Sequence, residues 1–238
     1  NIERVEQLVD LLEETMLLWQ QPRQQHVNGD SHTSNDKRRK TMASIDDSSA
    51  PHVFLTLLQA WAQRENAGAE VDRVLRRLIQ RATMCDGTAP NDTLLHWLSP
   101  QCFTVAIKAW ANTQDREDAA TNAEALLFMM EELAEKGFGH LTPNHYHYSA
   151  VISAWVEQKH AVNACERAMQ LLTRCHDKVG PNLIVHNAAL SVLAKHGDFD
   201  GADDVLQQIY MEDEPDGISF SNVIRAYAKN RNQDVEQR

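Results

Sequence analysis

The chain has 238 residues, a formal net charge of −11 and 42% hydrophobic residues. That length allows one large domain, two small ones or a row of repeats, and no apolar run approaches the roughly 18 residues of a membrane span. The acidic balance argues against a simple basic nucleic-acid binder. Nine Gly, seven Pro and helix-favouring strings such as EALLFMMEELAEK predict an all-α fold.

The first 50 residues divide into two segments. Residues 1–19 are acidic and amphipathic, and VEQLVDLL at residues 5–12 predicts the second helix of a preceding helical hairpin. Residues 20–50 are polar and nearly free of apolar side chains, which predicts a disordered insertion. The KRRK run within them is interpreted as a solvated charge run. The chain opens on Asn1 without a recognisable targeting peptide, which favours a fragment of a longer protein.

From residue 54 onward, one ten-residue pattern recurs in FLTLLQAWAQ, FTVAIKAWAN, YSAVISAWVE, HNAALSVLAK and FSNVIRAYAK. Each copy has a ring or imidazole, two polar or small residues, an apolar pair, and a small residue before a large anchor. The interval between anchors shortens along the chain, which indicates that inserted residues are lost from later units. We predict that the anchors face the core and do not stack on bases; they are Trp61, Trp110, Trp155, Leu193 and Tyr227.

A second helical pattern follows each copy of the first. AEALLFMM, AMQLLTRC and ADDVLQQI carry the apolar stripe of a helix packed on one face. Gly197 is predicted to end one helix in a left-handed conformation and Asp198 to start the next. Pro followed by Asn or Asp closes each unit at residues 90–91, 143–144, 181–182 and 215–216.

These hairpins predict how the chain is organised. One hairpin cannot bury both of its apolar stripes, so neighbouring hairpins must stack, and we predict an α-α superhelix, or solenoid. The predicted units are a divergent repeat with an insertion at residues 51–99, repeats at 100–144, 145–182 and 183–216, and a partial repeat at 217–238.

The 34-residue unit 183–216, closed by Pro215 and Asp216, resembles the pentatricopeptide repeat, and the longer units resemble its looser versions in algal and stramenopile organelle proteins. The Trp-Leu-Gly-Tyr pattern of the tetratricopeptide repeat is absent. The resemblance implies a single-stranded RNA-binding protein of mitochondria or plastids that acts in RNA processing, stability, editing or translation. In that family each repeat contacts one base with a polar residue early in its first helix and with its last residue.

Residue by residue, the resemblance implies three base slots, each made of a base-reading residue and the boundary residue that closes the repeat. By the family's code the first two slots favour adenine and the third favours uracil. Ser221 would open a further slot, whereas Leu55 offers no hydrogen bond to a base edge. The three slots are Thr104 with Asn144, Ser149 with Asn182, and Asn187 with Asp216.

Two further sets of residues follow from the resemblance. Tyr146, Ile184 and Ile218 would sandwich the bases, a role that Gln101 does not fit. Lys195 and Lys229 match the family's phosphate-contacting lysine, whereas Asn112 and Glu157 depart from it, so phosphate attraction should be weaker than usual. The acids of unit 183–216 are expected on the convex face, away from RNA.

The sequence also allows functions other than RNA binding. The base-reading residues could simply be polar residues near helix starts. The cluster His140, His145 and His147 has no cysteine at ligand spacing, so no metal site is predicted. We predict no cofactor and no enzyme within this segment; a further alternative is that these repeats are the guide domain of an enzyme whose catalytic domain lies elsewhere in the full-length protein. The main alternative is a scaffold that binds a protein partner on its acidic convex face.

Overall fold

A computed structural model describes residues 50–83, 98–113, 118–156 and 163–236. These residues are helical apart from their connections, so the predicted all-α fold is confirmed for this part of the chain. The segment predicted at residues 1–19, the insertion predicted at 20–50 except its last residue, and the insertion that follows Asn91 as far as residue 97 lie outside the described residues. The chain divides into two units, Asn1–Val53 and Phe54–Arg238, and all that follows concerns the second.

The helices alternate along the chain as the first and second members of hairpins, with one short 3-10 turn, η1, after α7. Their bounds are α3 Ala50–Ala62, α4 Gly68–Thr83, α6 Pro100–Ala111, α7 Ala119–Glu135, η1 Gly139–Leu141, α8 His145–Val156, α9 Ala164–Lys178, α10 Leu183–His196, α11 Phe199–Glu212 and α12 Gly217–Glu236.

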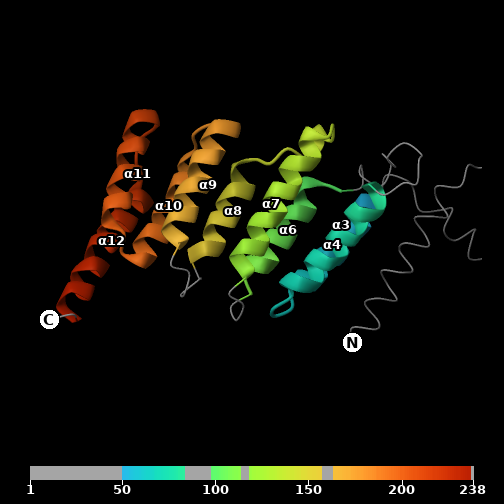
Figure 1. Cartoon of the computed structure of the whole chain (residues 1–238), viewed down its shortest axis with the longest axis horizontal. Helices are drawn as coiled ribbons and strands as arrows, with labels where there is room; N and C mark the ends of the chain where they lie inside the picture. The colour runs from blue at the N-terminus through green and yellow to red at the C-terminus, as the bar shows by residue number, and fades with distance from the viewer. Residues whose placement is uncertain (1–49, 84–97, 114–117, 157–162, 237–238) are drawn as a thin grey trace, which may run out of the picture. The chain divides into compact units, whose positions relative to one another are not determined.

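The helices from α6 onward stack side by side in chain order (Figure 1). We call α6, α8, α10 and α12 the first helices and α7, α9 and α11 the second helices. Each first helix packs on the next first helix, and each second helix packs on the first helices before and after it. Helix α4 packs on α6. The apolar stripe of each of these helices is therefore wide enough to contact the helix before it and the helix after it.

Local sequence explains where the helices of unit 183–216 begin and end. Gly197 takes a left-handed conformation, with φ 78°, after the last residue of α10, and the Asp198 carboxylate accepts a hydrogen bond from the Gly201 N–H at 3.0 Å to start α11. Both roles were predicted. An added Cβ at Gly201 would lie 2.9 Å from the Asp198 carboxylate, so a larger residue there would make the capping side chain shift.

The anchors lie in the core, with one exception. Trp61, Trp110, Trp155 and Leu193 are buried, which confirms that these side chains do not form an exposed stacking surface. Tyr227, in contrast, is 46% exposed, so the prediction that it faces the core was wrong. It lies on α12, and no second helix that follows α12 is present among the described residues to cover it.

Helix α4 approaches α6 closely at its first residue. A Cβ added to Gly68, the first residue of α4, would lie 2.7 Å from the Trp110 ring and 2.8 Å from the Thr113 hydroxyl. Only glycine lets the start of α4 approach the tryptophan this closely. None of the described helices is both long and apolar enough to cross a bilayer.

Candidate nucleic-acid interface

The boundary residues start the helices that follow them. In Asn144, Asn182 and Asp216 the Oδ1 atom accepts a hydrogen bond from the backbone N–H two residues later, at 3.1, 2.8 and 3.0 Å. This use of Oδ1 is ordinary helix capping. It leaves the amide nitrogen, a donor, on each Asn and the second carboxylate oxygen, an acceptor, on Asp216.

The structure brings Asn187 and Asp216 together. The Asn187 side-chain amide donates to the Asp216 carboxylate, at 3.2 Å from Oδ1 and 3.3 Å from Oδ2. The Ser219 hydroxyl lies between the two residues, 2.8 Å from Asn187 Oδ1 and 3.0 Å from Asp216 Oδ1. The two predicted partners of this slot are therefore held in one hydrogen-bonded group across two neighbouring first helices.

Hydrogen bonds keep the Asp216 carboxyl ionised. The backbone N–H of Ser219 contributes most, and the hydroxyl of Ser219, the amide of Asn187 and the N–H of Ile218 add to it, so the pKa of Asp216 falls below its usual 3.8. At neutral pH this side chain is an acceptor only.

Thr104 and Asn144 are joined through a third residue, His147. The His147 Nδ1 accepts from the Asn144 backbone N–H at 3.1 Å, which places the ring proton on Nε2. Nε2 lies 3.1 Å from both the Pro100 carbonyl and the Thr104 hydroxyl. The Thr104 hydroxyl in turn donates to Pro100 at 3.2 Å, so its proton is already engaged.

His147 is neutral in this arrangement. It is 2% exposed, and burial lowers the pKa of its imidazole below 6.5, although the hydrogen bonds with Pro100 and Asn144 act in the opposite direction. The slot of Thr104 and Asn144 is thus closed by a buried uncharged ring, whereas Ser219 closes the slot of Asn187 and Asp216.

The remaining predicted base-reading residues have less defined surroundings. Ser149 is half-buried on α8. The structure does not join it to Asn182 by a hydrogen bond. Ser221 is exposed on α12. The structure thus joins two of the three predicted slots, one directly and one through His147.

Three large apolar side chains are exposed in the first turns of successive first helices. Tyr146 on α8, Ile184 on α10 and Ile218 on α12 are 66%, 43% and 60% exposed. Each lies two residues after a boundary residue, so the same face of each helix presents them. Gln101, at the corresponding position of α6, is exposed but polar. These are the residues predicted to sandwich bases.

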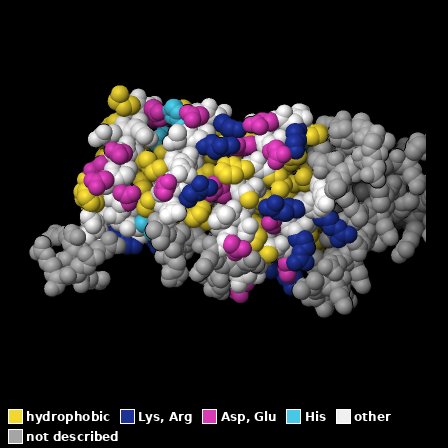
Figure 2. Space-filling model, viewed as in Figure 1, with side chains coloured by type: hydrophobic (Ala, Val, Ile, Leu, Met, Phe, Trp, Pro, Cys, Tyr) yellow, Lys and Arg dark blue, Asp and Glu magenta, His cyan; other side chains and the backbone are white. Residues whose placement is uncertain are grey.

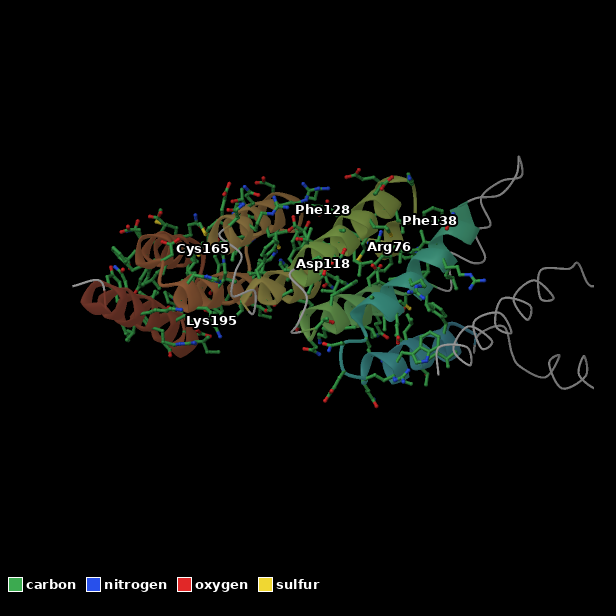
Figure 3. All side chains as sticks on the ribbon, turned by 60° about the horizontal axis from the view of Figure 1, so that its bottom comes forward. Arg76, Asp118, Phe128, Phe138, Cys165 and Lys195 are labelled. Carbon is green, nitrogen blue, oxygen red and sulfur yellow. The ribbon has the colours of Figure 1, made fainter. Side chains whose placement is uncertain are left out.

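The predicted phosphate-contacting lysines lie near the ends of the first helices. Lys195 is in the last turn of α10, and the Lys229 ammonium donates to the Lys195 carbonyl. Figure 3 shows Lys195 on the row of first helices and Phe128 and Cys165 on the row of second helices. The only Lys, Arg, Asp or Glu residues of α6, α8 and α10 are Lys108 and Lys195.

Acids concentrate on the second helices, where ion pairs join α7 to α9. Glu124 pairs with Arg167, Glu131 with Arg174, and Glu135 with Lys178 at 2.9 Å. Each pair is 43 residues apart in sequence, a regular spacing that the sequence interpretation missed although it is visible in EALLFMMEELAEK and ERAMQLLTRCHDK. Helix α11 also carries acids, which gather at its end of the molecule in Figure 2.

His147 and Ser219 are the other residues that sequence reasoning missed. Each stands three residues after a boundary residue, where Val185 stands in the intervening repeat. The sequence does carry a signal for them, because a polar residue stands at a position of the repeat that is buried. A buried polar side chain must find a partner, and here the partners belong to the preceding repeat.

The histidines considered for a metal do not converge. His147 is occupied as described, and the His145 Nε2 lies 3.3 Å from the Gly180 carbonyl. No group of three His, Cys, Asp or Glu side chains suited to a metal ion occurs within the described residues.

A scan against protein families finds no match to this chain, and a comparison with curated proteins finds none either.

Proposed function

We propose that this chain is a solenoid of pentatricopeptide-type repeats that binds single-stranded RNA along its row of first helices. The observation that carries the proposal is the direct contact of Asn187 with Asp216. These residues are 29 positions apart, and the resemblance to the pentatricopeptide repeat implies the same pairing. Amide and carboxylate groups held side by side at a helix start match the edge of an unstacked base.

The boundary residues differ in whether they donate or accept hydrogen bonds, so we propose that different slots bind different bases. A boundary Asn whose Oδ1 caps a helix presents a donor, which suits adenine N1 or cytosine N3. The ionised Asp216 presents an acceptor, which suits the N3–H of uracil or the N1–H of guanine. Asn187 then selects uracil in the proposed order adenine, adenine, uracil along consecutive repeats.

Stacking and charge favour the same surface. Tyr146, Ile184 and Ile218 expose flat or branched apolar surface beside the slots, and stacking on such side chains does not depend on base identity. Among the first helices, α6 and α10 carry one lysine each, and none of α6, α8 and α10 has an acid, which lowers the repulsion of phosphate that a net charge of −11 would otherwise cause. Lys195 and Lys229 would contact phosphates.

The experiment is binding of the chain to short single-stranded RNAs that contain AAU or a scrambled order, at two salt concentrations. We expect salt-sensitive binding that prefers AAU and is weakened by Asn187→Ala, because the base loses its amide partner. Ser191→Ala on the same helix is the matched control and should bind as the unchanged chain does. A folded chain that binds none of the RNAs would contradict the proposal.

By the family resemblance, this activity would take place in mitochondria or plastids, where occupancy of an RNA segment would control its processing, stability, editing or translation.

A protein partner on the face of the second helices is the second candidate function. The observation in its favour is the acidic surface of α11, with Asp200, Asp203, Asp204 and Glu212.

A further inference from the structure

The imidazole of His147 is held between two backbone groups of opposite polarity. Its Nδ1 lies 3.1 Å from the backbone nitrogen of Asn144, whose N–H can only donate a hydrogen bond, and its Nε2 lies 3.1 Å from the Pro100 carbonyl, which can only accept one. Together the two contacts require a lone pair on Nδ1 and a proton on Nε2. Burial lowers the pKa of this imidazole, so the ring keeps a single tautomer at neutral pH.

This tautomer decides how the Thr104 hydroxyl bonds. The His147 Nε2 lies 3.1 Å from Thr104 Oγ1, and because Nε2 carries a proton it can only donate to that oxygen. The hydroxyl proton is directed instead to the Pro100 carbonyl, at 3.2 Å. Thr104 is half-buried, and its Oγ1 keeps one lone pair, an acceptor, for a ligand.

Asn144, which is bound to the same imidazole ring, contributes the opposite polarity. Its Oδ1 accepts from the N–H groups of Tyr146 and His147, at 3.1 and 3.4 Å, which leaves its amide nitrogen as a donor. An acceptor with a donor matches a base that has an amino group next to an unprotonated ring nitrogen, namely adenine or cytosine. Guanine and uracil present a carbonyl oxygen next to a ring N–H, so both of their hydrogen bonds would be mismatched.

We propose that His147 is a positioning residue that makes the slot of Thr104 and Asn144 select the amino-bearing bases, adenine and cytosine, over guanine and uracil. It acts through Thr104, because its Nε2–H keeps the hydroxyl oxygen an acceptor toward the base. Without that N–H the hydroxyl is free to turn and can donate to a carbonyl oxygen of guanine or uracil, which weakens the discrimination. This role rests on the proposed RNA binding.

The next slot along the chain lacks a residue of this kind. Val185 stands at the position of His147, three residues after the boundary residue, and its side chain has no hydrogen-bonding group. Nothing at that position directs the Ser149 hydroxyl. We therefore expect the chain to distinguish adenine from guanine more sharply at the first slot than at the second, although Asn is the boundary residue of both.

The test measures binding of the whole chain to four short labelled RNAs that differ only in the first base of AAU, by fluorescence anisotropy. We expect AAU and CAU to bind about tenfold more tightly than GAU and UAU, because two hydrogen bonds are mismatched in the weaker pair. His147→Val, which introduces the residue of the next slot, should reduce this preference to about threefold or less. His147→Gln, which keeps an N–H donor on a side chain of similar length, should retain it.

Two further variants show whether His147 acts through Thr104. Thr104→Val should lower the first-base preference by itself, and His147→Val added to it should lower the preference no further. His145→Val is the matched control on the same helix start, since the His145 Nε2 lies 3.3 Å from the Gly180 carbonyl, and it should leave the preference unchanged. The preference for uracil over cytosine in the third base should persist in every variant, because the third slot is not altered.

Failure of this slot can be told apart from failure of RNA binding. A chain that prefers uracil in the third base but binds the four first-base RNAs equally, or keeps its first-base preference in His147→Val, overturns the role of His147 alone. A chain that binds none of the RNAs overturns both proposals. Nitrogen NMR of the imidazole tests the arrangement without RNA: the proton of His147 should be on Nε2, and a proton on Nδ1 would overturn the role as well.

Discussion

Helices α8 and α12 occupy the same place in successive hairpins, yet they present opposite surfaces. Tyr148 and Trp155 of α8 are buried, whereas Phe220 and Tyr227 of α12 are 42% and 46% exposed. The apolar pattern is the same in both. What differs is the presence of a second helix, because α9 covers α8 and no described helix plays that role for α12. In a stacked protein, burial is set by neighbours rather than by the helix itself.

The two helices also close the slot of the preceding repeat in different ways. His147 of α8 links Thr104 to Asn144, and Ser219 of α12 links Asn187 to Asp216. A buried imidazole fixes the first slot and leaves the Thr104 proton engaged. A small hydroxyl lets the two side chains of the second slot touch. The same backbone frame can thus give two slots with different chemistry.

The largest expected effect on the free energy of unfolding tests the difference in burial between α8 and α12. Tyr148→Ala should lower the free energy of unfolding by about 4 kcal/mol, since it removes a buried ring and its bond to Glu131. Phe220→Ala at the matching position of α12 should cost less, about 1 kcal/mol, because 42% of this side chain is already exposed to water. Urea unfolding followed by circular dichroism gives both values. Equal costs would show that the face of α12 is covered in solution.

The ion pairs of α7 and α9 provide the next test. Glu131→Gln should cost about 1 kcal/mol, because it removes the charge that pairs with Arg174, whose side chain is 42% exposed and therefore partly screened by water. Burial raises the pKa of Glu131, but the bonds from Arg174, Tyr148 and Lys178 outweigh it and hold the pKa below 4.5. The stability it provides is therefore present above pH 4.5 and is lost as pH falls through the lowered value.

Glu124 is the matched control for that pH dependence. Burial raises its pKa above 4.5 by more than Arg167 lowers it, so its contribution is lost as pH rises through the raised value. Urea unfolding at a series of pH values should show that Glu131→Gln removes part of the acid-side loss of stability, while Glu124→Gln does not. If both variants remove the same part, the two carboxyls are not distinguished by their surroundings.

An effect of similar size is expected from His147. His147→Leu should cost about 1–3 kcal/mol at neutral pH, because the Asn144 N–H loses its acceptor inside the protein. Burial keeps the folded-state pKa below 6.5, so the stability due to neutral His147 is present above pH 6.5 and falls away on acidification. The difference between the two proteins, measured from pH 7 to pH 5, should shrink. Ser219→Ala, which lacks a titrating group, should show no such change.

Much of the fold follows from the sequence, because local signals decide it. The apolar stripes place the helices, and Gly197 with Asp198 marks a helix end and a helix start. The direct contact of Asn187 with Asp216 agrees with the pairing that the family resemblance implies. These features depend on residues within one hairpin or on a constant spacing between hairpins.

The exposure of Tyr227 and the role of His147 could not be read from local pattern. Tyr227 resembles the buried Trp155 in sequence, and only the absence of a covering helix among the described residues separates them. His147 was grouped with His140 and His145 because they are close in sequence. Its partners Pro100 and Thr104 lie more than 40 residues away, on the helix of another hairpin.

The most direct measurement of base recognition exchanges the chemistry of one boundary residue. Asp216→Asn keeps the helix cap through Oδ1 but replaces Oδ2, an acceptor that the Asn187 amide reaches at 3.3 Å, by a donor. Binding of both proteins to RNAs containing AAU or AAC should show that the unchanged chain prefers uracil and that the variant prefers cytosine, whose N3 accepts, with each preference about tenfold. Unchanged preference in the variant, or no preference in either protein, would contradict base recognition by this slot.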